Sequence, residues 1–316
     1  MFISNQQITK LLPMSECIVA MKQLFLLDFD TDIVNPLRSK MFLPKPINGI
    51  LGMMPAYIKP YDIMGIKVLS VFPDNYKKGV SSHQGVLHLF ETNTGKLLVS
   101  LDADEITAIR TAAVSAVVTD LLATKTAENL CLIGSGKQAI KHLEAISQVR
   151  EIKKVTIWSK NKNNASKFVE QAKKSYNVSF KICATVEEAA SNADVICTVT
   201  ASKEPVLENH YLKQNVHINA VGACTTNTRE LTTEVITTSK VFVDDNIAAT
   251  NEAGDILIPA LELGYDAHKL IKATISDILK DSTLYDASEK TVFKSLGLAA
   301  EDLAAGFYCY NKNKIN

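Results

Sequence analysis

The chain has 316 residues, with 34 Lys and Arg against 34 Asp and Glu, so its formal net charge at neutral pH is zero. Hydrophobic residues make up 47% and charged residues 22%, as in ordinary globular proteins, and the length indicates two domains. This balance argues against nucleic-acid binding, which needs a basic surface, and no apolar run reaches the roughly 18 residues that would cross a bilayer.

Before about residue 120 the pattern is one of strands and helices separated by turn residues. Apolar runs predict strands at 51–58, 65–72, 85–90 and 96–101. Asn93, Thr94 and Gly95 separate the last two runs and indicate a hairpin, so we expect an antiparallel sheet. Asp102 followed by Glu105 predicts the start of an Ala-rich helix, which we expect to connect the two domains.

After residue 128 strands alternate with helices, which predicts a parallel sheet. Strands are expected at 130–133, 155–158, 178–183, 193–200, 217–222 and 240–244, and helices at 137–149 and 163–174. A last helix is expected from Glu289 to Tyr310, returning to the first domain. The predicted fold class is α/β. A Rossmann-type parallel-sheet domain at 119–288 accompanies an α+β substrate and dimerisation domain at 1–118, which the helix at 289–316 joins.

A glycine-rich loop follows the strand at 130–133 and opens a helix. Its residues Gly134 to Ala139 match the G-x-G-x-x-G/A fingerprint of dinucleotide-binding sites. Gly134 permits the tight turn, Gly136 leaves room for a pyrophosphate, and Ala139 permits close packing of the helix on the strand. The alternative is a plain glycine turn. The context of strand, loop and helix favours cofactor binding.

The second strand of this unit ends at Trp158, where NAD-binding sites usually carry an acid for the ribose 2′-hydroxyl. Here the chain has Ser159 and Lys160, followed by Asn161 and Lys162. The two lysines would attract a 2′-phosphate and no carboxylate would repel it, so NADP(H) is favoured over NAD(H). The alternative is that both lysines only form a solvated loop face.

Cysteine and histidine spacing argues against metal or disulfide frameworks. Six scattered cysteines without a C-x-x-C pair, three of them in apolar runs, predict structural thiols in a reduced compartment. The six histidines form no H-x-x-x-H pattern, so no metal site is expected. The first ten residues lack the pattern of a secretory signal, which favours a cytoplasmic protein.

Several segments resemble one family, in order and over nearly the whole chain. They are residues 82–84, 106–116, the loop at Gly134, 219–231, Asp244, 252–256 and 291–298. The chain is identified by them as a member of the ornithine cyclodeaminase/mu-crystallin family. Within it, the chain is most similar to the ketimine reductase and Δ1-pyrroline-2-carboxylate reductase members. The resemblance implies a homodimer, with the substrate and dimer contact in the first domain and the nicotinamide in the second.

The resemblance also implies site residues. Arg38, Lys67 and Arg110 match the family's catalytic and substrate-carboxylate cations, while Ser82 and His83 match residues near the nicotinamide. From the residues themselves, Lys67 interrupts an apolar strand and Arg110 an apolar helix, so each charge is expected to need a partner such as a substrate carboxylate. The alternatives are an outward-facing strand lysine for Lys67 and a structural ion pair for Arg110. Arg38, in loop sequence, is by itself typical of a surface arginine. The complete set of expected cofactor-binding residues is Ser82, His83, Arg110, Thr111, Gly134, Ser135, Gly136, Lys137, Gln138, Ser159, Lys160, Thr198, Val199, Thr200, Val221 and Gly222.

One departure separates the activities within the family. Ornithine cyclodeaminases place an acid/base aspartate two residues after the glycine that matches Gly222, and this chain has Cys224 there; Thr226 replaces the usual proline. Deamination with ring closure needs a positioned acid/base, whereas imine reduction does not. The sequence therefore favours reduction of Δ1-pyrroline-2-carboxylate to L-proline, or of the six-membered homologue to L-pipecolate. The alternatives are ornithine cyclodeaminase, an alanine or opine-type dehydrogenase, and a non-enzymatic hormone-binding protein.

Overall fold

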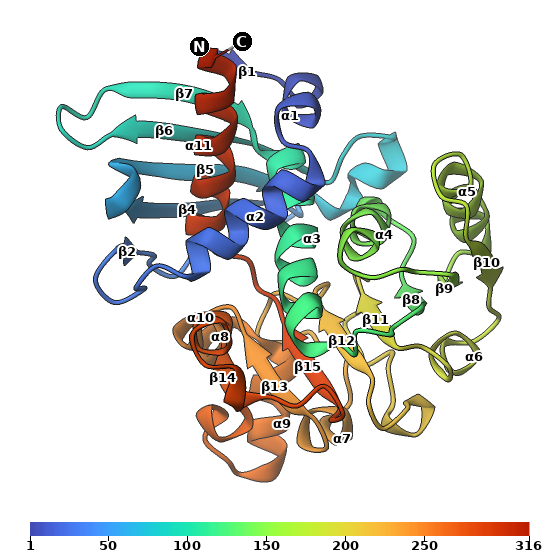
Figure 1. Cartoon of the computed structure of the whole chain (residues 1–316). Coiled ribbons are helices and arrows are strands. Elements are labelled where there is room, and N and C mark those ends of the chain that lie inside the picture. The colour runs from blue at the N-terminus through green and yellow to red at the C-terminus, as the bar shows by residue number, and fades with distance from the viewer. Residues whose placement is uncertain (316) are drawn as a thin grey trace. The chain divides into compact units, whose positions relative to one another are not determined.

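The computed structural model of the chain describes residues 1–315 (Figure 1). It consists of two compact units. Unit 1 contains residues 1–110 and the segment from 297 onward, and unit 2 contains residues 111–296. The sequence places the corresponding boundaries near residues 118 and 288. Together the units form the predicted α/β fold, with one mixed sheet and one parallel sheet.

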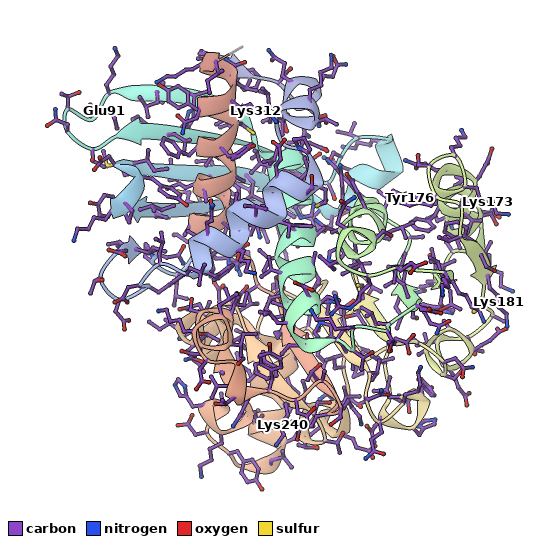
Figure 2. The ribbon with its side chains drawn as sticks, in the orientation of Figure 1. Glu91, Lys173, Tyr176, Lys181, Lys240 and Lys312 are labelled. Atoms are coloured by element: carbon purple, nitrogen blue, oxygen red, sulfur yellow. The ribbon has the colours of Figure 1, made fainter. Side chains whose placement is uncertain are left out.

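Unit 1 is built on a seven-stranded sheet in the order β1-β7-β6-β5-β4-β2, with β3 also paired to β4. Its strands are β1 (Phe2–Ile3), β2 (Ile33–Val34), β3 (Ser39–Phe42), β4 (Ile50–Ile58), β5 (Ile63–Val71), β6 (His83–Glu91) and β7 (Leu97–Asp102). All pairs are antiparallel except β1 with β7. The predicted hairpin is confirmed: Gly95 has a φ of +74°, and Glu91 accepts hydrogen bonds from the loop amides at that end of the sheet (Figure 2).

The α-helices that lie entirely within unit 1 are α1 (Asn5–Leu11), α2 (Met14–Phe25) and α11 (Ala299–Ile315). Helix α11 crosses the sheet and contacts β4, β5, β6 and α2 (Figure 1). Its close approach depends on Gly306, because a Cβ there would lie 2.6 Å from Leu87 Cδ2. The first turns of α11 are consequently buried against the strands.

Helix α3 (Ala103–Leu122) follows β7 and contains the division between the units, which falls after Arg110. Asp102 Oδ1 accepts hydrogen bonds from the backbone N–H groups of Asp104 (3.0 Å) and Glu105 (3.3 Å). These bonds satisfy amides of the first turn that have no partner inside the helix. The predicted helix start at Asp102 is therefore confirmed.

Unit 2 is a Rossmann-type domain with eight parallel strands in the order β10-β9-β8-β11-β12-β15-β13-β14. The strands are β8 (Asn129–Ile133), β9 (Lys154–Trp158), β10 (Ser179–Ile182), β11 (Val195–Thr198), β12 (His217–Ala220), β13 (Lys240–Val243), β14 (Ala273–Thr274) and β15 (Thr291–Lys294). The helices are α4 (Lys137–Val149), α5 (Lys162–Ala172), α6 (Val186–Ala190), α7 (Thr233–Thr237), α8 (Asn246–Glu252), α9 (Gly254–Leu263) and α10 (Ile275–Lys280). The parallel sheet predicted from the alternation of strands and helices is confirmed.

The predicted helix from Glu289 to Tyr310 is wrong in its first part. Residues 291–294 form β15, which inserts between β12 and β13 and is fully buried. The β-branched and aromatic residues Val292 and Phe293 suit a strand covered on both faces. The chain then turns at Gly297, whose φ is +75°, and α11 begins only at Ala299.

Throughout residues 1–315, every helix is too short or too polar to cross a membrane.

Candidate functional site

Unit 1 contains a buried cluster of two cations and two carboxylates. Lys67 Nζ lies 2.6 Å from Asp302 Oδ2. Arg110 Nε lies 2.8 Å from the other oxygen of Asp302, and Arg110 Nη1 lies 2.7 Å from Glu301 Oε2. The side chains of Lys67 and Arg110 are 3% and 4% exposed, and both carboxylates are fully buried. Such burial is tolerated because each charge has an opposite partner.

Three separate elements bring this cluster together. Lys67 lies in the middle of β5, Arg110 on α3, and Glu301 and Asp302 on the first turn of α11. The hydroxyl of Thr107, one turn before Arg110 on α3, accepts a hydrogen bond from Lys67 Nζ at 3.4 Å. The lysine ammonium thus contacts one oxygen atom from each of two helices.

Burial and the neighbouring charges shift the ionisation of this cluster. Burial lowers the pKa of Lys67 to about 8, the Asp302 carboxylate opposes that shift, and the charges of Arg110 and Arg38 add to it. Burial opposes ionisation of Asp302 too, but Arg110 and Lys67 hold its pKa below the usual range. Lys67 can therefore exchange a proton near neutral pH, while Asp302 remains a carboxylate.

Arg38 approaches the same cluster through Gly297. Arg38 Nη2 donates a hydrogen bond to the carbonyl oxygen of Gly297 at 3.1 Å. A Cβ on Gly297 would lie only 2.2 Å from Arg110 Nη1, so this position needs a glycine for space as well as for its positive φ. The structure thus brings together the three cations that the sequence predicts, Arg38, Lys67 and Arg110.

His83 is the first residue of β6, which pairs with β5, and Ser82 directly precedes it. Ser82 Oγ is 3.0 Å from His83 Nδ1, and the histidine is exposed. Both residues belong to unit 1, whereas the glycine loop belongs to unit 2. Their contact with a cofactor stays a prediction.

Apart from Thr111, which is buried on α3, the expected cofactor residues of unit 2 lie at the carboxyl end of the parallel sheet. Gly134 follows β8 and Ser159 follows β9, while Thr198 ends β11 and Val221 follows β12. Strand register aligns these ends, because Ile133 pairs with both Trp158 and Thr198, and Thr198 pairs with Ala220. This edge of an open α/β sheet is where such folds bind ligands.

The glycine loop fits a dinucleotide. Gly134 has a φ of +116°, and a Cβ there would lie 2.7 Å from the carbonyl oxygen of Val199. Gly136 faces open space, and it precedes α4 without a side chain to cap the helix. The first amides of α4, beginning at Lys137 and Gln138, could therefore bind a pyrophosphate. Ser135 Oγ donates to Ser159 Oγ at 2.9 Å, which joins this loop to the end of β9.

Two groups of residues in these regions were missed from the sequence. Glu301 and Asp302 carried a signal, since two adjacent acids interrupt an Ala-rich apolar segment. Glu230 carried none, because it follows the polar run 225–229, yet it is fully buried and accepts a hydrogen bond from Thr198 Oγ1. The side chain of Thr198, which the sequence assigns to cofactor binding, is thus buried and hydrogen-bonded to Glu230.

The chain is similar to known proteins over almost its whole length. The sequence profile of the ornithine cyclodeaminase/mu-crystallin family matches residues 1–315. The chain is 34% identical to mouse ketimine reductase mu-crystallin over 314 residues, covering 98% of this chain and 96% of the relative. It is also 34% identical to a Δ1-pyrroline-2-carboxylate reductase of Bacillus cereus, covering 98% of this chain and 95% of the relative.

A solved structure extends the similarity to three dimensions. Thermococcus litoralis Δ1-pyrroline-2-carboxylate reductase, in complex with NADH and L-proline, superposes with a TM-score of 0.95 at 33% identity. The match covers 100% of this chain and 98% of that one.

Proposed function

The chain belongs to the ornithine cyclodeaminase/mu-crystallin family, and we propose that it is an NAD(P)H-dependent reductase of cyclic ketimine carboxylates. The proposed reaction converts Δ1-pyrroline-2-carboxylate to L-proline, with reduction of Δ1-piperideine-2-carboxylate to L-pipecolate as a second activity. The observation that carries this proposal is the buried cluster of Lys67, Arg110 and Asp302, which holds a lysine of lowered pKa beside a guanidinium.

Each cation has a proposed role. Arg110 and Arg38 bind the substrate carboxylate, for which a planar guanidinium is well suited. Lys67, whose pKa is about 8, keeps the imine nitrogen protonated. The resulting iminium carbon is electrophilic, and a nicotinamide cofactor held by the loops of unit 2 would supply the hydride for its reduction. Asp302 orients Lys67 and Arg110 together, so the chain contributes mainly positioning and charge.

Cys224 supports reduction over deamination. It lies after β12 and is half-buried, and its thiol donates to the carbonyl oxygen of Val221 at 3.4 Å. A thiol engaged in this way is a poor substitute for the carboxylate that cyclodeamination uses at this position.

The decisive test has two arms. Purified protein is mixed with NADPH and Δ1-pyrroline-2-carboxylate, and the loss of NADPH absorbance is followed. In parallel, ammonia is measured with L-ornithine and NAD. We expect rapid oxidation of NADPH and no ammonia. Ammonia and proline formed from ornithine would instead assign the chain as a cyclodeaminase.

For the cofactor, we propose that NADP(H) is preferred, with Lys160 binding the 2′-phosphate beside Ser159. Lys160 is exposed after β9, and Ser135 and Ser159 form the loop contact next to it. Lys160→Ala should raise KM for NADPH about tenfold, equivalent to about 1.4 kcal/mol, and leave KM for NADH unchanged. Lys173→Ala, at the far end of α5 (Figure 2), is the matched control. Equal effects on both cofactors would contradict the assignment.

We further propose that the protein is a cytoplasmic homodimer. Exposed apolar side chains on β2 and β3, namely Val34, Met41 and Phe42, suit a subunit interface in unit 1. Within residues 1–315 the six cysteines form no disulfide, which is compatible with a reducing compartment. Sedimentation equilibrium tests the dimer, and a monomer at micromolar concentration would contradict it.

A further inference from the structure

A single buried carboxylate, Glu230, connects the ends of two strands of unit 2. Its Oε1 accepts hydrogen bonds from the backbone N–H of Thr200 at 2.8 Å and from Thr200 Oγ1 at 2.7 Å. Its Oε2 accepts from Thr198 Oγ1 at 2.8 Å and from the backbone N–H of Gly222 at 2.7 Å. All four donors belong to residues that end or follow β11 and β12.

These bonds fix the segments that the proposed cofactor site uses. Thr198 and Thr200 flank Val199, and the carbonyl oxygen of Val199 is the atom against which Gly134 packs. On the other side, Gly222 lies so close to Thr200 that a Cβ on it would be 2.1 Å from the carbonyl oxygen of Thr200. Glu230 therefore holds residues 198–200 against residues 221–222, and through Val199 it supports the position of the glycine loop.

Glu230 has its own support from two other buried residues. Asp255 Oδ1 accepts from the backbone N–H groups of Glu230 (2.8 Å) and Leu231 (2.9 Å), which fixes the backbone that carries the carboxylate. Asp255 Oδ2 lies 3.0 Å from Lys294 Nζ, and this ammonium also donates to the carbonyl oxygens of Ala220 and Ala223. A network in which every member has partners is rigid, since breaking one bond leaves a buried polar group unsatisfied.

The donor set uses both carboxylate oxygens as acceptors. Burial raises the pKa of Glu230 and the Asp255 charge adds to that shift, whereas the Lys294 ammonium and the hydrogen bonds from Thr200 oppose it. Two of the four donors are backbone N–H groups, which cannot accept a proton, so both oxygens of Glu230 must be acceptors. A neutral amide of the same shape has only one acceptor oxygen. Its NH₂ group would face the N–H of either Thr200 or Gly222, and one loop would lose its contact.

We propose that Glu230 is a positioning residue for the nicotinamide cofactor: it holds the loops after β11 and β12 in the conformation that binds the dinucleotide, without touching the reacting atoms. This proposal rests on the proposed function, because it takes these loops as the cofactor site. The proposal predicts that replacing Glu230 weakens the binding of the cofactor. The substrate cluster around Lys67 lies in unit 1 and should be unaffected.

The test compares Glu230→Gln with the parent and with Glu234→Gln. Glu234 is an exposed acid four residues later, on α7, and serves as the matched control. Binding of NADPH and NADH is titrated without substrate, by the fluorescence of the reduced nicotinamide. We expect Glu230→Gln to raise Kd and KM for the cofactor at least tenfold. At saturating cofactor, kcat and KM for the imine should remain within about twofold of the parent.

A readout without cofactor separates positioning from general stability. In the unliganded protein, peptides covering residues 198–200 and 221–223 should exchange amide hydrogens faster in Glu230→Gln than in Glu234→Gln. If Glu230→Gln is too unstable to purify, Thr198→Val removes one of the four donors and should weaken cofactor binding in the same direction, by a smaller factor.

The outcomes distinguish the two proposals. A folded Glu230→Gln protein with parental cofactor affinity overturns the positioning role, as does a variant whose only change is a lower Tm. A parent protein that binds NAD(P)H but does not reduce the imine contradicts the proposed substrate, and the affinity difference between Glu230→Gln and the parent still decides the role of Glu230.

Discussion

Replacing Asp302 by asparagine tests the proposed role of Lys67 directly. Asp302 lies 2.6 Å from Lys67 Nζ and favours its ammonium form, so its removal should lower the pKa of Lys67 further below about 8. An opposite charge at such a distance typically changes a pKa by about 1 to 3. Because the reaction as proposed needs the protonated lysine, the activity of Asp302→Asn should decline at a lower pH than that of the parent.

The size of the effect follows from the protonated fraction of Lys67. With a pKa of about 8, roughly three quarters of the lysine is protonated at pH 7.5, and with a decrease of about 2 only about 3% remains so. We therefore expect kcat of Asp302→Asn at pH 7.5 to be about 30-fold below its own value at low pH. The assay is imine reduction at saturating substrate and cofactor, measured from pH 5.5 to 9.5.

Glu301→Gln is the matched control, because Glu301 contacts Arg110 in the same cluster while Asp302 contacts both cations. Its activity should still decline near pH 8. The reasoning is refuted if the alkaline limb of Asp302→Asn stays near pH 8, or if both variants shift by the same amount.

Three further predictions concern stability. Gly297→Ala places a Cβ 2.2 Å from Arg110 Nη1 at a positive φ, so it should cost about 1–3 kcal/mol and raise KM for the imine; unchanged thermal unfolding would contradict the packing. The pKa of Lys67 is about 8 in the folded protein, compared with an ordinary value of 10.5, so below pH 8 the buried ammonium lowers the free energy of unfolding. As the pH rises from 8 to 10.5 the folded protein releases this proton and the destabilisation disappears. In urea unfolding, the stability of Lys67→Met relative to the parent should therefore decrease by about 3 kcal/mol from pH 7 to 10.5, and a constant difference would be inconsistent with a buried ammonium. Thr185→Ala removes the acceptor of the Glu188 backbone N–H and should cost about 1 kcal/mol in the same assay, with no effect on kcat.

The strands of unit 2 were predictable because a strand that is buried on both faces consists of consecutive apolar residues. Residues 130–133 and 155–158 are examples, and both coincide with observed strands to within a residue or two. The exception is β15, whose four residues precede a helical pattern and are too few to show a period of their own. Its place between β12 and β13 is decided by tertiary packing.

The candidate site was only half predictable. Lys67 and Arg110 stood out because a charge interrupts an apolar strand or helix, and such a charge needs a partner. The partner of Arg110, Asp302, lies 192 residues further along the chain, and no local pattern connects the two. Glu230 is harder still, because its burial follows from how the loop after β12 folds back onto β11.

The discontinuity of unit 1 has a consequence for the order in which the protein forms. Helix α11 is synthesised after the whole of unit 2, yet it carries the two carboxylates that neutralise Lys67 and Arg110. Until α11 arrives, β4 to β6 lack the contacts that this helix makes with them, and Lys67 and Arg110 lack their carboxylate partners. Unit 2, which is contiguous, can fold on the ribosome first, since domains generally fold as units during synthesis. The N-terminal segment therefore completes its core last, and a stop codon before residue 297 should yield an insoluble product although the segment that forms unit 2 is nearly complete.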